Sequence, residues 1–392
     1  MSTKPTFAPW PHYAADEIAA AVAVLQSGKV NYWTGDIGRE FERDYAAATQ
    51  RKHAVAVANG TLALELALLA FGIGAGDEVI TASRTYVASA SCAVMRGAVP
   101  VVADVDADSQ CITAATIRAA ITPRTRAMIP VHLAGWPCPM DEIMALADEH
   151  GLVVIEDCAQ AHGATLNGRP VGAFGHAAAF SFCQDKIITT GGEGGMLVLD
   201  DEQAWKCAWA YKDIGRSHDA VYHRDHAPGF RWLTESFGSN WRLTEVQAAI
   251  GRIQLAKLPE WTRQRQHNAM LLADGLSGLD GLRVPTPPTG VGHAYYKFYA
   301  FVEPERLAPG WSRDRVMAGI NAAGIHCTVG SCSEIYLEKA FTDRGWGPPQ
   351  ALPVARALGE TSLLFMVHPT LAAQTLHSTV DVVRTVMREA LR

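Results

Sequence analysis

Short, wholly apolar runs alternate with longer segments of helical periodicity from about residue 50 onward. Strands that are apolar throughout are typical of a sheet that is buried on both faces. The intervening segments, for example 140–151, place their apolar residues on one helical stripe. This alternation predicts an α/β fold with a mostly parallel central sheet and helices on both faces. The expected strands are 53–58, 76–83, 99–106, 125–133, 152–159, 177–183 and 194–201.

The pattern changes after about residue 250. Pro259, Pro285, Pro287 and Pro288 interrupt the chain, an aromatic strand is expected at 295–302, and helices are expected at 313–323 and 378–391. A helix near 244–265 would connect the two parts. We therefore predict a large domain over residues 1–250, which includes an N-terminal helical segment, and a smaller α+β domain over 251–392.

Composition and charge exclude several classes of protein. The 34 Lys and Arg against 40 Asp and Glu give a formal net charge of −6, which argues against a nucleic-acid binder or a basic membrane-surface protein. No run approaches the roughly 18 apolar residues of a membrane span. The apolar run Ile18 to Leu25 follows two acidic residues, which argues against a signal peptide. The 8 scattered cysteines form no CxxC pair, so we expect no zinc site or disulfide framework and a cytoplasmic protein.

The segment Asn59-Gly60-Thr61 stands where a strand ends and a helix begins. A helix N-terminus presents unpaired N–H groups and a partial positive charge, so a phosphate binds there readily. Gly60 allows close approach of the backbone and Thr61 adds a hydroxyl. A helix N-cap with no ligand is the alternative interpretation.

A second candidate is the strand that ends in Asp157, with Gln160 and His162 beyond it. Ligands of open α/β folds bind at the carboxyl ends of the strands, and a carboxylate after an apolar run needs a cation. A protonated pyridine nitrogen would be such a cation. Asp157 as a cap of the next helix remains the alternative.

Lys186 lies between an apolar strand and a glycine-rich turn, in SFCQDKIITTGGEGG. A partly desolvated lysine has a lowered pKa and forms imines with aldehydes. Ser181 precedes it and could reach a phosphate, while Tyr86 could stack on a flat ring. An exposed loop lysine and a core tyrosine are the alternatives. The glycines do not match a nucleotide-binding loop, because an apolar strand follows them.

The order of these features is more specific than any one of them. A phosphate-type helix start, an aromatic residue, a strand-end aspartate and then a lysine reproduce a pyridoxal 5'-phosphate (PLP) site, which requires a Schiff-base lysine and a partner for the pyridine nitrogen. We expect no metal.

These motifs resemble those of the DegT/StrS-type sugar-nucleotide aminotransferase family, which has the aspartate-aminotransferase (type I) fold. The likeness runs through WTGDIGREFERDYA, NGTLALELAL, GDEVITASRTYVASA, VIEDCAQAHGA, FSFCQDKIITTGGEGG and FGSNWRLTEVQAAIG, and covers nearly all of the large domain. Some members are sugar 3-dehydrases that replace the lysine with histidine. The lysine of this chain therefore favours transamination.

The resemblance implies a role for each candidate. Lys186 would carry the cofactor and shuttle protons, Asp157 would pair with the pyridinium, and Gln160 would bind near the ring hydroxyl. Tyr86 would stack on the ring. The phosphate would be held by Gly60, Thr61 and Ser181, and by Asn240 of a neighbouring subunit, which implies a homodimer with shared active sites.

The implied reaction uses L-glutamate as amino donor, yields 2-oxoglutarate, and aminates a nucleotide-linked keto sugar, a 4-keto-6-deoxy hexose by resemblance, for amino-sugar, polysaccharide or glycoside biosynthesis. A PLP-dependent sugar dehydrase and a non-catalytic regulator with the same fold remain alternatives. The segment 326–341 departs from the family pattern and leaves the sugar contacts open.

Three histidines, His218, His223 and His226, could suggest a metal, but we interpret them as part of an active-site loop. Lys212, Arg231 and Arg242 could meet a substrate diphosphate or simply be solvated.

Overall fold

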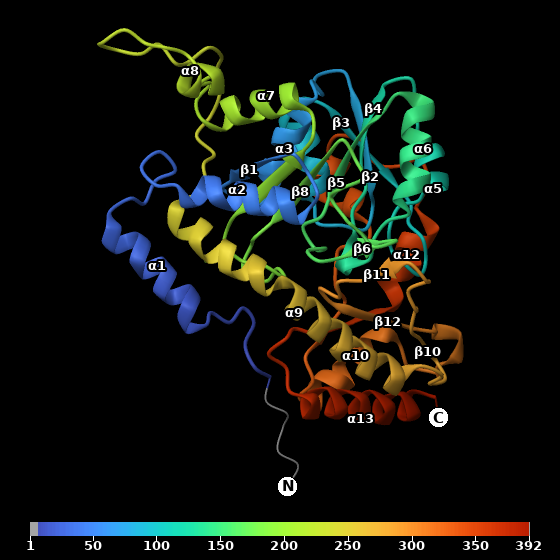
Figure 1. Cartoon of the computed structure of the whole chain (residues 1–392). Helices are drawn as coiled ribbons and strands as arrows, with labels where there is room; N and C mark the ends of the chain where they lie inside the picture. The colour runs from blue at the N-terminus through green and yellow to red at the C-terminus, as the bar shows by residue number, and fades with distance from the viewer. Residues whose placement is uncertain (1–6, 392) are drawn as a thin grey trace.

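The computed structural model describes residues 7–391. Seven strands form the central sheet in the order β1-β9-β8-β5-β4-β2-β3 (Figure 1). All neighbouring strands are parallel except β9, which is antiparallel to both β1 and β8. The predicted α/β fold with a mostly parallel sheet is confirmed. The strands are β1 (His53–Val57), β2 (Glu78–Ala82), β3 (Val99–Ala103), β4 (Thr125–Ile129), β5 (Val153–Asp157), β8 (Ala177–Ser181) and β9 (Gly195–Leu199).

Alternate residues of each strand point to opposite faces of the sheet, and both faces are covered. On one face, Val55, Ile155 and Leu197 pack against α3 (Gly60–Ala70), α4 (Ala88–Met95) and α7 (Glu202–Lys212). On the other face, Ala56 and Val154 belong to two further apolar clusters. Their helices are α2 (Ile37–Ala48), α5 (Ala114–Arg118), α6 (Met140–His150) and the start of α9 (Glu245–Leu276).

A second, antiparallel sheet follows in the C-terminal part, in the order β10-β12-β14-β13. It packs against α10 and α13 around its own apolar cluster, at the lower side of the molecule in Figure 1. The elements are β10 (Leu282–Arg283), β12 (Phe298–Val302), β13 (Cys327–Thr328), β14 (Ser362–Phe365), α10 (Arg313–Ala322), α11 (Lys339–Thr342), α12 (Pro353–Thr361) and α13 (Ala373–Ala390).

The remaining elements are small or peripheral. They are α1 (Ala15–Ser27), α8 (His218–Tyr222), a small sheet of β6 (Thr165–Leu166), β7 (Arg169–Pro170) and β11 (Val291–Gly292), and the short 3-10 helices Leu133–Gly135, Pro304–Arg306 and Ile335–Leu337. No helix among the described residues is both long and apolar enough to cross a membrane.

Helix α9 is longer than the sequence predicts. It starts at the Thr244 cap, whose hydroxyl accepts from the N–H of Gln247, and it continues through Pro259 to Leu276 instead of ending near residue 265. Proline removes one hydrogen bond of a helix, but α9 packs against α1, α2 and α13 along its length, and this packing keeps it continuous. Because α9 crosses residue 250 (Figure 1), a domain division at that position stays a prediction.

Glu156 holds the loop after β7 against β5. Its buried carboxylate accepts from the N–H groups of Gly172, Phe174 and Gly175 at 2.7, 2.8 and 2.7 Å. The Nδ1 of His132 accepts a hydrogen bond from the backbone N–H of Cys138. The ring proton is therefore on Nε2, which donates to Glu156 at 3.1 Å. Burial works to raise the pKa of Glu156, but these donors lower it below its ordinary value.

We expect Glu156→Gln to destabilise the protein by about 3 kcal/mol, because an amide NH₂ would face a donor and leave buried N–H groups without an acceptor. The free energy of unfolding from urea titration measures this. The control is Glu149→Gln, which removes an exposed partner of Arg118 and should leave the midpoint unchanged. Equal midpoints for the two variants would contradict the role of Glu156.

Candidate active site

A cavity of about 1070 Å³ lies at the carboxyl ends of the parallel strands, where ligands of open α/β sheets bind. It is large enough for a cofactor and a substrate together. Its lining comes from the starts of α3 and α4, the ends of β5 and β8, the loop 182–194 and the segment 326–338. All but one of the predicted site residues line it: Gly60, Thr61, Tyr86, Asp157, Gln160, Ser181 and Lys186.

The N-terminus of α3 forms one end of the cavity. Asn59 caps this helix by accepting from the N–H of Leu62 at 2.9 Å, so the N-cap interpretation is correct for Asn59. Gly60 and Thr61 still line the cavity beside Ser181. A Cβ on Gly60 would lie 2.6 Å from the Cβ of Ser181. Only glycine lets the helix start approach β8 this closely, which leaves two hydroxyls and backbone N–H groups for a phosphate.

Asp157 ends β5 and is almost fully buried. Its Oδ2 accepts from the hydroxyl of Ser89 at 2.7 Å and its Oδ1 from the N–H of Ala159 at 3.1 Å. Burial raises the pKa of Asp157, while Ser89, Ala159 and the charge of Lys186 work to lower it. A cationic ring nitrogen would stabilise the charged form of this buried carboxylate. Asp157 is therefore suited to the predicted role as the partner of a pyridinium. Ser89 was not predicted, although it lies in the segment SRTYVASA with Tyr86.

Gln160 and Tyr86 face the cavity in different ways. The Oε1 of Gln160 accepts from the N–H of Ala134 at 2.8 Å, which leaves its NH₂ group to donate into the cavity. Tyr86 is 68% exposed and lines the cavity, so its ring is not a core residue and presents a face for stacking. His162 lies behind the wall, where it contacts the Tyr45 hydroxyl at 2.7 Å and the Ser181 carbonyl at 2.9 Å.

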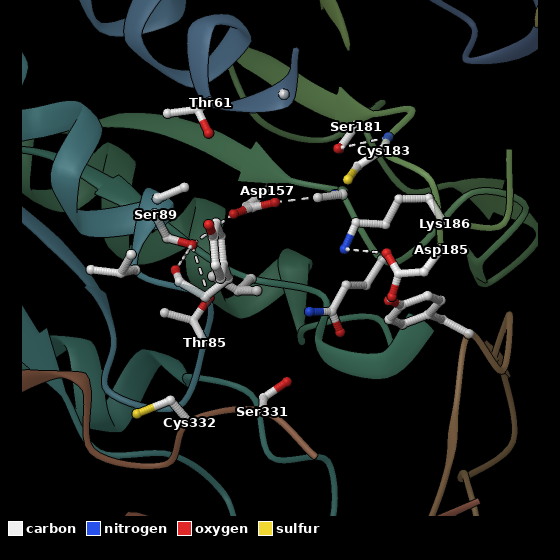
Figure 2. A pocket seen from close by; sticks show the side chains of 18 of the residues that line it. Thr61, Thr85, Ser89, Asp157, Ser181, Cys183, Asp185, Lys186, Ser331 and Cys332 are labelled. Atoms are coloured by element: carbon white, nitrogen blue, oxygen red, sulfur yellow. Dashed lines mark hydrogen bonds and ion pairs between the residues drawn. The ribbon is translucent and has the colours of Figure 1, made fainter. Parts of the chain in front are cut away.

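Lys186 extends toward Asp157 from the loop that joins β8 to β9 (Figure 2). Its side chain is only 16% exposed, so it is not an ordinary surface lysine. Its Nζ lies 3.9 Å from Asp185 and 4.9 Å from the ring centre of Tyr296. Burial works to raise the pKa of Asp185, but Lys186, the hydroxyl of Tyr296 and Lys297 lower it below its ordinary value. None of Asp185, Tyr296 and Lys297 was predicted from the sequence.

The segment 326–338 forms the wall of the cavity that faces the sheet. Ser331 and Cys332 lie on the side of the cavity opposite Thr61 (Figure 2). The N–H of Thr85 donates to the carbonyl of Cys332 at 3.1 Å, which fixes this wall to the chain after β2. The segment for which the sugar contacts were left open therefore lies within the site.

Several other candidates lie outside the cavity of their own chain. Asn240 is exposed and does not line it. The three histidines do not line it either, and His226 bonds the carbonyl of Ala220 at 2.6 Å. Lys212 is neither solvated nor available to a diphosphate, because it is fully buried 2.9 Å from Glu42. Arg242 pairs with Asp213.

The arrangement fits PLP: a helix start with hydroxyls for the phosphate, an exposed ring for stacking, a buried carboxylate and a shielded amine. The residues that would hold it are Gly60, Thr61, Ser181, Tyr86, Asp157, Gln160 and Lys186.

Comparisons with known proteins agree with the site. The dTDP-3-amino-3,4,6-trideoxy-alpha-D-glucose transaminase of Streptomyces venezuelae is 36% identical over 371 residues, which cover 94% of this chain and 92% of that protein. The GDP-perosamine synthase of Caulobacter vibrioides is 41% identical over 299 residues, covering 75% of this chain and 76% of that protein. The crystal structure of an aminotransferase from Psychrobacter cryohalolentis has a TM-score of 0.97 and 52% identity, covering 99% of this chain and 100% of the other.

The model of the DegT/DnrJ/EryC1/StrS aminotransferase family matches residues 11–384. The enzymes of this family depend on PLP, and the residues that such a cofactor requires line one cavity in this structure. The chain therefore belongs to the DegT/DnrJ/EryC1/StrS aminotransferase family and is a PLP-dependent aminotransferase.

Proposed function

We propose that this protein transfers the amino group of L-glutamate to a nucleotide-linked keto sugar, a 4-keto-6-deoxy hexose. The observation that carries the proposal is the shielded amine of Lys186 in one cavity with Asp157. The relatives that act on dTDP-linked and GDP-linked sugars support the substrate class. The size of the cavity, about 1070 Å³, also supports a substrate as large as a nucleotide sugar.

The chain's own residues account for binding and proton transfer. Bound PLP supplies an aldehyde for covalent attachment of an amino group and a ring that withdraws electrons. Asp157 would keep the ring nitrogen protonated, because burial makes an unpaired carboxylate costly there. The Nζ of Lys186 would move a proton from the α-carbon of the donor to the former aldehyde carbon of the cofactor, and in the second half of the reaction it would move a proton from that carbon to the acceptor. Asp185 would hold this amine in place at 3.9 Å.

Two alternatives differ from this proposal in their products. A dehydrase would remove a hydroxyl from the sugar and would not release 2-oxoglutarate. A non-catalytic regulator would bind PLP, but glutamate would not convert the bound cofactor to its pyridoxamine form. The match to an aminotransferase family and the relative named as a transaminase support the aminotransferase over both.

We further propose a homodimer in which Asn240 reaches the cofactor phosphate of the neighbouring subunit. Asn240 is exposed and lies outside the cavity of its own chain, as such a role requires. It follows a projecting segment (Figure 1) that carries the exposed side chains Phe230, Trp232 and Phe237, which are 79%, 80% and 99% exposed. Large apolar side chains at such exposure are typical of a contact surface.

We expect the wild-type protein to release 2-oxoglutarate when it is given L-glutamate and a 4-keto-6-deoxy hexose nucleotide. Lys186→Ala should lower turnover at least about 10²-fold, because a positioned acid–base group contributes 10²–10⁴-fold, and should abolish the visible absorbance of lysine-bound cofactor. The matched control is the exposed lysine in Lys52→Ala, which should keep both properties. Loss of the sugar hydroxyl without 2-oxoglutarate would instead establish a dehydrase.

Ser89→Ala should weaken PLP binding by about 10-fold. The reason is that Asp157 loses a hydrogen bond of 2.7 Å to its charged form, and such bonds are worth about 1.5 kcal/mol or more. Equilibrium titration of the apoprotein with PLP measures the dissociation constant. Ser91→Ala, on the same helix but outside the cavity lining, is the control. Equal affinities of the two variants for PLP would show that the hydrogen bond from Ser89 to Asp157 does not contribute to cofactor binding.

Mixed dimers test the shared site. A hybrid of one Lys186→Ala subunit and one Asn240→Ala subunit should recover activity that neither parent homodimer has, because one of its two sites then combines an intact Lys186 with an intact Asn240. If Asn240 acts within its own chain, the hybrid contains no intact site. Activity of purified, differently tagged hybrids decides between these arrangements.

A further inference from the structure

The cavity contains a second lysine that the proposed mechanism does not use. Among the described residues that line it, the basic side chains are Lys186, Lys297 and His326. Lys297 directly precedes β12 and belongs to the smaller part of the protein, so it approaches the cavity from a different element than Lys186 does. A cation in this position is available to an anionic group of a substrate.

The ammonium of Lys297 forms no direct ion pair with a described residue, and among these residues only the negative charge of Asp185 acts on it, from a distance. Its Nζ lies 3.4 Å from Sδ of Met366 and 4.5 Å from the ring centre of Tyr296, and no carboxylate of the described residues lies within ion-pair distance. An ammonium has three donors, and a thioether is a weak acceptor. Burial lowers the pKa of Lys297 to about 8, so the group is still protonated at neutral pH. A buried charge with so few partners is costly unless an anion binds it.

The backbone before Lys297 is held in a costly conformation. Tyr295 has φ of +46°, which is uncommon for a bulky residue. The ring of His293 stacks on Tyr295 with centres 3.8 Å apart, and its Nδ1 accepts from the N–H of Tyr295 at 2.9 Å. This turn directs Tyr296 and Lys297 to the cavity. Strain that is maintained by several contacts is typical of functional sites.

We propose that Lys297 binds the α-carboxylate of the amino donor. This inference rests on the proposed function, since it requires an amino acid as donor. Lys186 must reach the α-carbon to move its proton, and the donor's α-carboxylate is bonded to that carbon. The two ammonium nitrogens lie 4.9 and 4.5 Å from the same Tyr296 ring, so a carboxylate beside the reacting carbon lies within reach of Lys297.

Other anions are less suited to this position. The cofactor phosphate belongs at Gly60 and Thr61, and Figure 2 places Thr61 well apart from the Lys186–Asp185 pair. Asp185 itself does not neutralise Lys297 by contact, because it accepts from the hydroxyl of Tyr296 and pairs with Lys186. The side-chain carboxylate of glutamate lies several bonds from the reacting carbon. The α-carboxylate is therefore the group that the position of Lys297 favours.

The test compares amino donors in the half-reaction with the PLP-loaded enzyme. L-Glutamine keeps the α-carboxylate, whereas L-isoglutamine carries an amide there and keeps the side-chain carboxylate. In the wild type, isoglutamine should be at least about 10-fold poorer than glutamine in rate constant over KM, because an ionic hydrogen bond is lost. Lys297→Met should lower this parameter about 10- to 100-fold for glutamate and glutamine and change it little for isoglutamine. Lys297→Arg should restore part of the loss.

A binding measurement gives a readout without turnover. Calorimetric titration with maleate, a non-reactive dicarboxylate, should show affinity at least about 10-fold weaker for Lys297→Met than for wild type, and Lys52→Met should bind as wild type does. The wild-type donor comparison needs no variant, so it holds even where a variant folds poorly.

The possible failures are distinguishable. If no amino acid converts the bound cofactor of the wild type, the proposed function is wrong. If glutamate converts it but the wild type accepts isoglutamine as well as glutamine, only the role of Lys297 is overturned. A defect of Lys297→Met confined to the half-reaction with the sugar would assign this lysine to the diphosphate of the acceptor, and would also overturn the inference.

Discussion

The active site depends on the close approach of the start of α3 to the end of β8 and the beginning of β9. A Cβ on Gly60 would lie 2.6 Å from Ser181, and a Cβ on Gly195 would lie 2.3 Å from the carbonyl of Asn59. Side chains at these two positions would push the helix start away from the sheet. The contact brings the backbone N–H groups of α3, the hydroxyl of Ser181 and the loop with Lys186 to the same edge. The two glycines thus determine how close the phosphate end of the cavity lies to its reactive amine.

The sequence predicted the large sheet well because its strands are buried on both faces and are therefore apolar throughout. It also predicted the carboxyl-end residues, since Asp157, Ser181 and Lys186 each follow such a run. It did not predict that β9 is antiparallel. A signal was present, because no helical segment separates residues 181 and 195, and a parallel strand would need a crossover connection there.

The residues that the sequence missed act through contacts between distant segments. Ser89 bonds Asp157 from helix α4, and Tyr296 and Lys297 approach Lys186 from the smaller part of the protein. No local pattern marks such pairs. Glu156 illustrates the same limit: it stands beside Asp157 in the sequence, yet the strand turns it to the opposite face, where it serves backbone N–H groups instead of a cofactor.

The two halves of the cavity are subject to different constraints. The cofactor half is built from strand ends whose positions the sheet fixes. The other half is the segment 326–338, and Arg84 secures it: this fully buried guanidinium donates to Gln110 at 2.8 Å, to Ser333 at 2.8 Å and to Ser362 at 3.1 Å. All three acceptors are neutral, so the cation is satisfied without a carboxylate whose charge would extend into the cavity. Anchored in this way, the wall can differ in the side chains that face a sugar while the contacts of the cofactor stay the same.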